Sequence, residues 1–387
     1  MTQLGDVCNF KEWKLAEVCD RLSSGKVIRS SELTGNGAYP VIGGNGERGR
    51  TETYNFDGEC AVVGRQGANC GNTRFFKGKA YMTEHAVVVQ GNEKVNTRYL
   101  AALLSTMHLG QLSAQSAQPG LSVKTLAKQT VALPPREVQD RIAILLTTID
   151  DSIYNINQTN GYLEAIGQEL FSAELGLNDL GEDEYFCLAD IAEGNPKRVL
   201  KKGEIAKCVD MSSLSTDGPY PSSWVTKPYS GGMRFINGDT LIARITPCLE
   251  NGKIAFVNFL EDGETAFGST EYIVLTGQRG IPNGLFYFLA RDRHFIDYMV
   301  SHMNGSSGRQ RVSAADALAY PIRSVNRNQL QFTGEKLDKI LDAIRANSEQ
   351  MKKLAELRDT LLPRLMSGEI DVSKVELPKQ SNSHLCG

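Results

Sequence analysis

The stretch REVQDRIAILLTTIDDSIYNINQTNGYLEAIGQELF, residues 136–171, decides the fold expected of this chain. One set of apolar residues recurs in it at every seventh position: Ile142, Ile149, Ile156, Leu163 and Leu170. A heptad pattern sustained over about four repeats is typical of a helix that pairs along its length with another helix. Leu133-Pro134-Pro135, just upstream, is a helix-start signal. We therefore predict a helix over residues 136–175. Its part from Arg136 to Phe171 would be roughly 54 Å long.

A second heptad segment follows Tyr320-Pro321-Ile322 and is assigned to residues 327–371. One register contains Leu330, Leu337, Ile344, Met351 and Leu365, and the other contains Ile340, Leu354 and Leu361. Arg358 and Asn347 interrupt these registers, and an Asn at such a position commonly fixes the pairing of helices. Pro363 is expected to kink or end the helix, and Gly368 to stop it.

The two segments together predict an antiparallel coiled coil. The companion positions on the first helix are expected at Val138, Leu145 and Ile166. The predicted seam consists of Ile142, Leu145, Ile149, Ile156, Leu163, Ile166, Leu337, Ile340, Ile344, Met351, Leu354 and Leu361. The alternative is that each helix packs only on its own domain, with its outer face in solvent.

The sequence outside these helices contains an internal repeat. WKLAEV at residues 13–18 matches FCLADI at 186–191, and residues 56–65 match 236–244, each ending an apolar strand with a single Arg. Residues 83–89 are aligned with 270–275, so that Glu84 corresponds to Glu271. A period this long indicates a duplicated domain, not a solenoid.

The expected architecture is therefore α+β, with two copies of one α/β domain, two long helices and a pseudo-twofold arrangement. The copies are assigned to residues 1–135 and 176–326, the second including a connector at 176–184, and a tail to residues 372–387. Strand-like runs such as residues 60–63 and 240–243 predict a Gly-rich, partly antiparallel sheet in each copy. Short helices are expected from Thr97 to Met107 and from Gly284 to His294.

Composition narrows the class of protein. The 387 residues are 41% hydrophobic and 22% charged, which is typical of globular domains, and the net charge is −3. Residues 1–135 contain 15 basic and 11 acidic side chains, whereas residues 136–185 contain 2 and 11. A broadly basic nucleic-acid coat is excluded, but a local basic face is not. Without a signal peptide, a long apolar run or a CxxC pair, a cytoplasmic protein that does not enter a membrane is expected.

The usual signatures of catalysis are missing from the sequence. Residues 44–49 match GxGxxG, but a strand-like polar segment follows where a phosphate-binding helix would be needed. Asp217-Gly218-Pro219-Tyr220 resembles only loosely the Asp-Pro-Pro-Tyr signature of amino-methyltransferases. The five histidines are scattered, and no HExxH occurs. We expect no catalytic residue, no metal site and no cofactor on this chain.

Several longer strings resemble a known family. They are Tyr39–Gly46 with Tyr54–Gly58 and Val63–Gly67, Leu241–Lys253, Gly268–Tyr272, Gly305–Ser313 and Leu361–Ile370. Together they are similar to the DNA-specificity subunits of type I restriction–modification systems, over roughly residues 11–371. The helix starts depart from the family pattern, because the second helix lacks a double proline.

The resemblance implies a role and a set of partners. Each copy is expected to be a target recognition domain that reads one half of a bipartite, asymmetric sequence in double-stranded DNA, with the helices as spacer. Two modification (methyltransferase) subunits and restriction motor-nuclease subunits are the expected partners, and they would bring S-adenosylmethionine, ATP and Mg. Adenine methylation or restriction would take place on those subunits.

Candidate DNA-binding residues are exposed donors in loops and at strand ends. They are Asn45, Arg48, Arg65, Asn72, Arg244, Asn251, Lys253, Ser306, Arg309, Gln310 and Arg311. For Arg65 and Arg244 an equally good alternative is a structural Arg paired with an acidic neighbour.

Two other functions remain open from the sequence. The chain could be the recognition subunit of a related type II system with a fused methyltransferase-nuclease, or a coiled-coil adaptor that binds only protein. A stand-alone methyltransferase is disfavoured because its cofactor motifs are missing.

Overall fold

The computed structural model describes residues 10–113, 120–175, 185–216, 218–306, 309–323 and 326–377. The chain divides into two compact units, of which unit 1 comprises residues 1–153 with 353–387 and unit 2 comprises residues 154–352. The predicted connector at 176–184 lies outside the described residues, as do Asp217, Ser307 and Gly308. Within the described ranges, no helix is long and apolar enough to cross a membrane.

The described part of unit 1 contains a six-stranded sheet in the order β2-β7-β5-β6-β3-β4. Its strands are β2 (Cys19–Ser24), β3 (Tyr39–Gly43), β4 (Gly46–Thr51), β5 (Phe56–Gly64), β6 (Thr73–Met82) and β7 (Ala86–Gly91). Along β5, Ala61 and Val63 belong to the core beneath helix α1 (Thr97–Thr106), while Cys60 and Val62 belong to a core on the opposite face. This alternation is the period of two expected of a strand covered on both faces.

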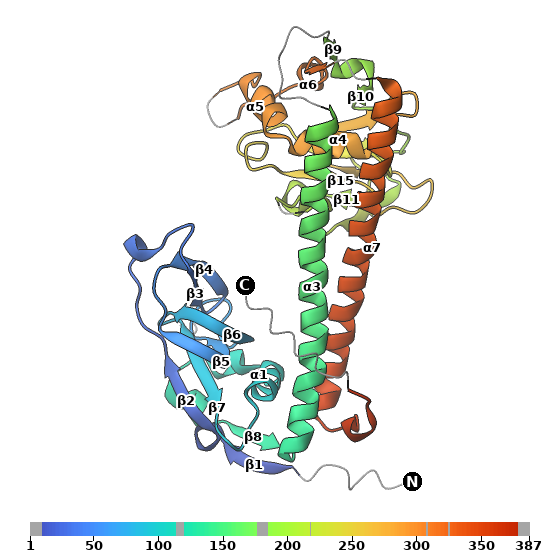
Figure 1. The fold of residues 1–387 in the computed structure, drawn as a ribbon. Helices are drawn as coiled ribbons and strands as arrows, with labels where there is room; N and C mark the ends of the chain where they lie inside the picture. The colour runs from blue at the N-terminus through green and yellow to red at the C-terminus, as the bar shows by residue number, and fades with distance from the viewer. Residues whose placement is uncertain are drawn as a thin grey trace. The chain divides into compact units, whose positions relative to one another are not determined.

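Smaller elements complete unit 1. Strands β1 (Lys11–Lys14) and β8 (Thr130–Leu133) pair antiparallel, and α2 (Val123–Ala127) precedes β8. Short 3-10 turns are η1 (Leu15–Val18), η2 (Ser30–Glu32), η3 (Leu109–Leu112) and, in the tail, η6 (Val372–Lys374). Helix α1 lies between the sheet and the first turns of α3 (Figure 1).

Most described strands of unit 2 belong to two four-stranded sheets, while β9 (Tyr185–Cys187) and β18 (Pro321–Arg323) pair antiparallel as a separate two-stranded sheet. One has the order β10-β17-β14-β15, from β10 (Ala192–Gly194), β14 (Thr240–Ala243), β15 (Ile254–Phe256) and β17 (Tyr272–Gly277). The other has the order β12-β11-β16-β13, from β11 (Ile205–Val209), β12 (Val225–Pro228), β13 (Arg234–Phe235) and β16 (Ala266–Gly268). The remaining elements are η4 (Leu188–Asp190), η5 (Met211–Ser213), α4 (Gly284–Arg291), α5 (Arg293–Ser301) and α6 (Ala314–Leu318).

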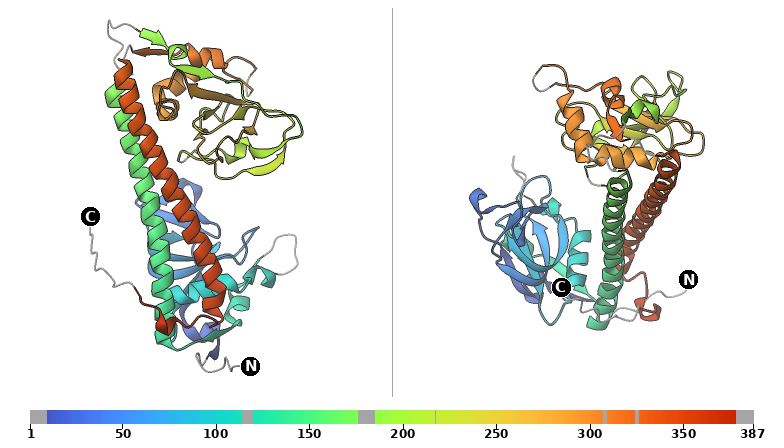
Figure 2. Two further views of the ribbon diagram at one scale, coloured as in Figure 1. Left: turned by 90° about the vertical axis from the view of Figure 1, so that its right-hand side faces the viewer. Right: turned by 45° about the horizontal axis from the view of Figure 1, so that its top comes forward.

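The two long helices are α3 (Arg136–Leu175) and α7 (Arg327–Met366). In unit 2 they lie side by side and run antiparallel, since Asn160 of α3 contacts Ser348 of α7 whereas Glu174 accepts from Gln329 (Figures 1 and 2). In unit 1 the same pairing brings Asp150 of α3 to Arg358 of α7. The expected fold class, with two sheet-containing domains and long spacer helices, is confirmed.

The backbone shows that the duplication is real. Leu15 donates to Gln129 in unit 1 as Leu188 donates to Tyr320 in unit 2, each at 2.9 Å. Three residues after Leu15 and Leu188, the carbonyls of Val18 and Ile191 accept from Asn92 at 2.9 Å and from Gln278 at 2.8 Å. Each of these donors directly follows a sheet strand, β7 in unit 1 and β17 in unit 2. We use "first copy" for residues 10–135 and "second copy" for residues 185–326.

Pairing of the strands corrects one sequence alignment. Gly64 is opposite Ala86 in the first copy, and Ala243 is opposite Tyr272 in the second. His85, not Glu84, therefore corresponds to Glu271. The expected alignment of residues 83–89 with 270–275 is wrong by one position, because a one-residue slip would turn the apolar side chains of β7 to the opposite face.

Two helix ends also differ from expectation. The helix expected from Gly284 to His294 stops at Arg291, because the Asp292 side chain accepts from the nitrogens of His294 and Phe295 and begins α5 as a new helix. Helix α7 was expected to reach residue 371, but it ends at Met366. It continues one turn past Pro363 and stops where Gly368 adopts a left-handed φ of 74°.

The observed seam lies close to the predicted one. Ile142, Ile149, Leu337 and Ile344 are buried, and Leu145, Ile156, Leu163, Ile340, Met351, Leu354 and Leu361 are half-buried. Ile166 is 57% exposed, so its assignment to the seam is wrong. The companion register of α3 lies one residue later, at positions such as Leu146, which is buried, and Asn160 and Gly167. A polar and a glycine residue at these positions concealed the register in the sequence.

Candidate nucleic-acid interface

The strongest candidate site is a corner built where the central strand of each copy ends. In the first copy, β5 ends at Gly64, and Arg65 donates its backbone nitrogen to His85 at 3.0 Å. Leu121 donates to the carbonyl of Arg65 at 2.8 Å, and Gly64 donates to Asn72 at 2.8 Å. These bonds bring three separate loops around Arg65.

The second copy repeats these three bonds. Arg244 donates to Glu271 at 3.0 Å, Val312 donates to Arg244 at 3.0 Å, and Ala243 donates to Lys253 at 3.0 Å. We call the two sites the first corner (Gly64, Arg65, Asn72, His85, Leu121) and the second corner (Ala243, Arg244, Lys253, Glu271, Val312). Main-chain bonds thus place Arg65 and Arg244 equivalently.

The Gly-rich loop of the first copy packs onto the first corner. A Cβ on Gly44 would lie 2.9 Å from the carbonyl oxygen of His85 and 3.5 Å from the nitrogen of Arg65, so only glycine allows this approach. Next to it, the exposed Asn45 accepts from Arg74 at 3.2 Å. The exposed Arg48 packs its side chain over Gly43. The sequence-predicted Asn45, Arg48, Arg65 and Asn72 are therefore brought to one region.

A surface depression adjoins this region. It is lined by Cys70–Arg74 on one side and by Ser105 and His108–Gln111 on the other. Asn72 and Arg74 are exposed there, and Asn72 donates to Asn69 at 3.1 Å. Arg65 is half-buried and has no side-chain hydrogen bond or ion pair within the described part of the chain. The alternative of a structurally paired Arg65 thus finds no partner there.

The second corner is more strongly charged. Glu271 binds the guanidinium of Arg311 in a bidentate manner, with Nε–Oε2 and Nη2–Oε1 distances of 2.8 Å. Arg311 also donates from Nη1 to the carbonyl of Arg309 at 3.3 Å. These hydrogen bonds and the charges of Arg311 and Arg244 hold the pKa of Glu271 below its ordinary value, although partial burial opposes them.

The other predicted residues of the second copy differ in whether their side chains are exposed or already hydrogen-bonded within the protein. Lys253 is committed to the carbonyl of Met211 at 3.0 Å. Arg244 has its Nε buried without a hydrogen-bond partner among the described residues. Ser306, Arg309 and Asn251 are exposed, and Gln310 is half-buried with its carbonyl accepting from Thr246. Lys253 is therefore tied to the protein and Arg311 is tied in part, whereas Arg244 and Arg309 keep free donors.

Sequence reasoning missed His85 and Glu271 of these corners, and Arg74 beside the first corner. Arg74 follows a strand start without any motif, and only its bond to Asn45 reveals its position. His85 and Glu271 were hidden by the one-residue misalignment of β7 with β17. A search for equal strand pairing, and not for equal letters, would have found them.

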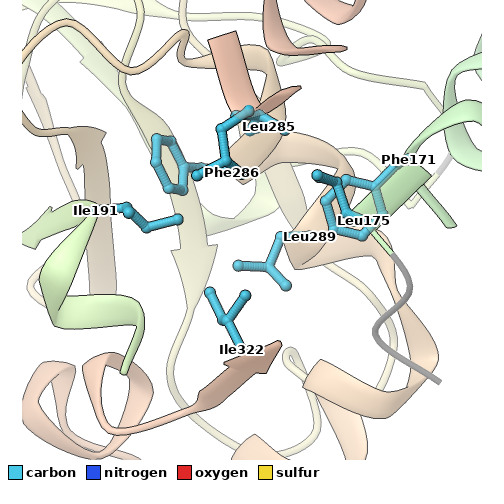
Figure 3. Close-up of a pocket in the computed structure, with 8 residues that line it drawn as sticks. Phe171, Leu175, Ile191, Leu285, Phe286, Leu289 and Ile322 are labelled. Atoms are coloured by element: carbon cyan, nitrogen blue, oxygen red, sulfur yellow. The ribbon is translucent and has the colours of Figure 1, made fainter. Parts of the chain in front are cut away.

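No metal centre accompanies the corners, since the described residues contain no group of three or more His, Cys, Asp or Glu side chains placed to hold a metal ion. One pocket of unit 2 is small and apolar, lined by residues such as Phe171, Ile191, Leu289 and Ile322 (Figure 3). It is part of the core between α3, α4 and β18, and none of the side chains that line it is polar.

One known protein family matches the first part of the chain. Residues 8–165, which include the first corner and most of α3, match the family described as type I restriction modification DNA specificity domain. Residues 8–165 thus resemble a specificity domain of type I restriction–modification systems.

Individual relatives agree. The chain is 41% identical over 122 residues to the EcoprrI specificity subunit of Escherichia coli, covering 32% of this chain and 30% of that one. It is 36% identical over 138 residues to the EcoAI specificity subunit of the same species, covering 33% and 23%. The chain thus spans about a third or less of the length of these two specificity subunits.

Among solved structures, the S subunit of a type I system from M. genitalium has the same fold. The TM-score is 0.61 at 17% identity, with 94% of this chain and 98% of that chain covered. At this identity the likeness concerns the fold alone.

Proposed function

We propose that this chain reads a bipartite, asymmetric DNA sequence, one half with each copy. The observation that carries the proposal is the repeated corner: two copies present an equivalently placed Arg among exposed polar side chains. Two surfaces with the same backbone arrangement but different side chains are suited to bind two half-sites of different sequence.

The chain acts in this proposal without catalytic groups of its own. It recruits two modification subunits, which transfer methyl groups from S-adenosylmethionine to adenine, and motor-nuclease subunits that use ATP and Mg. The acidic, exposed faces of α3, where Asp151 and Glu169 lie, are available for partners.

Methylome sequencing tests the proposal directly. Cells that carry the intact system, compared with cells that lack this chain alone, are expected to show one gapped motif with different halves. Methylation only at short ungapped motifs, or methylation that persists without this chain, would contradict it.

The spacer role has its own test. Insertion of one heptad into α3 and the matching heptad into α7 lengthens each helix by about 10 Å. At about 3.4 Å per base pair, the gap in the methylated motif should grow by roughly three base pairs, with both halves unchanged. An unchanged gap would show that the helices do not set the spacing.

A further inference from the structure

The two corners have one side chain in common and differ in the side chains around it. Arg65 and Arg244 occupy equivalent positions and are the same residue. Around them, His85 stands where the second copy has Glu271. The antiparallel bridges of Gln66 with Gly120 and of Ile245 with Arg311 place Gly120 where the second copy has Arg311.

The Glu271–Arg311 pair is consequently a feature of the second corner alone. A carboxylate that binds Nε and Nη2 of an arginine fixes the plane of its guanidinium. Of the five N–H donors of Arg311, one on Nη1 and one on Nη2 remain after the bonds to Glu271 and Arg309. The side chain is 40% exposed, so these two donors can reach a ligand.

Free donors on Nη1 and Nη2 of one fixed guanidinium suit the O6 and N7 acceptors of guanine in the major groove. Phosphate oxygens, in contrast, occur in every half-site, and contacts to them position a protein without specifying sequence. A residue shared by both copies suits the phosphate, and a residue confined to one copy suits a base.

We propose that Arg65 and Arg244 anchor the two copies to the DNA backbone, and that Arg311, oriented by Glu271, reads a guanine in the second half-site only. This rests on the function proposed above. Glu271 is a positioning residue in this scheme, because it acts through Arg311. The first copy has Gly120 in place of the arginine and reads its half-site with other side chains.

The experiment uses the complex of this chain co-expressed with its modification subunits, and a duplex carrying the methylated motif of the wild type. Arg65→Gln and Arg244→Gln should each weaken binding to all sequences alike. Each should also lower the slope of log Kd against log salt by about 1, the value of one phosphate contact. Arg345→Gln on α7, which removes a half-buried Arg whose ion pair in the described residues is with Glu349, is the matched control and should change neither.

The reading residues give a different signature. Arg311→Met and Glu271→Gln should each relax one base position in one half of the motif, lowering discrimination there about 5- to 150-fold. Glu271→Gln leaves the charge of Arg311 in place, so an effect on base choice cannot come from lost attraction to phosphate. Arg311→Lys should not restore discrimination, because an ammonium lacks the two donors of a fixed guanidinium.

Two outcomes would overturn the inference while the proposed function stands. One is a wild-type gapped motif that stays the same at every position in Arg311→Met and Glu271→Gln. The other is a changed motif with an unchanged salt slope in Arg65→Gln or Arg244→Gln. Thermal unfolding identifies a variant that does not fold, and the two arginine variants test the anchor independently. Failure of the proposed function is seen in the wild type itself, as binding without sequence preference.

Discussion

The two copies contact the long helices through different chemistry, although the same backbone bonds build both. In unit 1, Arg98 at the start of α1 binds Asp150 of α3, which also accepts from Arg358 of α7 at 3.0 Å. Burial lowers the pKa of Arg98, and the nearby Asp150 opposes this. In unit 2, strand alignment places Gly284 where the first copy has Arg98, and its nitrogen donates to Asp338 of α7 at 2.6 Å.

The difference lies in how closely the backbones approach. A Cβ on Gly284 would lie 2.9 Å from the nitrogen of Asp338 and 3.0 Å from the carbonyl carbon of Leu337. Gly334 and Gly167 similarly leave room for Pro282 and Phe288. In the first copy, charged side chains bridge the distance to the long helices. In the second copy, glycine residues allow the backbone to pack directly against them. One fold thus tolerates two unrelated ways of docking.

Loss of core packing in unit 2 should have the largest effect. Leu337 of α7 is fully buried beneath α4, so Leu337→Ala should cost about 2–5 kcal/mol of unfolding free energy. Denaturant unfolding measures it, with Leu357→Ala, a 48% exposed leucine on the same helix, as control. Equal costs for the two would contradict the packing described for α7.

Filling the glycine contact comes next. Gly284→Val should destabilise by about 1–3 kcal/mol, because the side chain has no room against the backbone of α7. Gly161→Ala is the control: nothing lies within 4 Å of its Cβ, and it should stabilise α3 by roughly 0.5–1 kcal/mol. A harmless Gly284→Val would mean that the two copies dock alike.

Breaking the ionic contact in unit 1 should cost less. Asp150→Ala leaves Arg98 and Arg358 without their shared carboxylate and is expected to cost about 1–2 kcal/mol. The cost should shrink with added salt, since Asp150 is 37% exposed and screening reaches it. Asp151→Ala, at the exposed next position, serves as control. A cost that does not depend on salt would argue against an electrostatic contact.

A change of pH should have a smaller effect, through the carboxylate of Glu271 in the second corner. The pKa of Glu271 is lowered in the folded chain, so its stabilising effect is complete above the unfolded value near 4.5 and is lost as the pH falls through the folded value. The melting temperatures of wild type and Glu271→Gln should differ at neutral pH and converge below pH 4.5.

The smallest effect is expected at Ile166. Because its side chain is 57% exposed, Ile166→Ala should change the unfolding free energy by no more than about 0.5 kcal/mol. Ile149→Ala, at a buried position of the same helix, provides the contrast in the same denaturant titration. A cost of Ile166→Ala comparable with that of Ile149→Ala would restore the original seam.

The sequence was informative where a pattern repeats. Heptads at Ile142 and Leu337 predicted the two long helices, and matching strings predicted the duplication. It failed where a polar or glycine residue holds a structural position, as Asn160 and Gly167 do in the companion register of α3. Periodicity counts apolar letters, whereas packing also uses an Asn160–Asn347 hydrogen bond of 2.8 Å and the space above Gly167.

The corners show a second limit. Arg65 and Arg244 could be chosen from sequence, because each follows an apolar strand. That Arg311 is bound by Glu271 could not, because the two lie 40 residues apart and meet only through the pairing of β14 with β17. Side-chain partners across a sheet depend on register, and one misplaced residue changes all of them.

The main-chain bonds of the corners have an evolutionary consequence. Each is made by an N–H and a C=O that nearly every amino acid possesses, so replacing His85 or Glu271 leaves the scaffold intact. Mutation can therefore explore new side chains there without first searching for compensating changes in the core. In the function proposed above, the side chains that meet DNA can change in this way while the backbone of each copy stays the same.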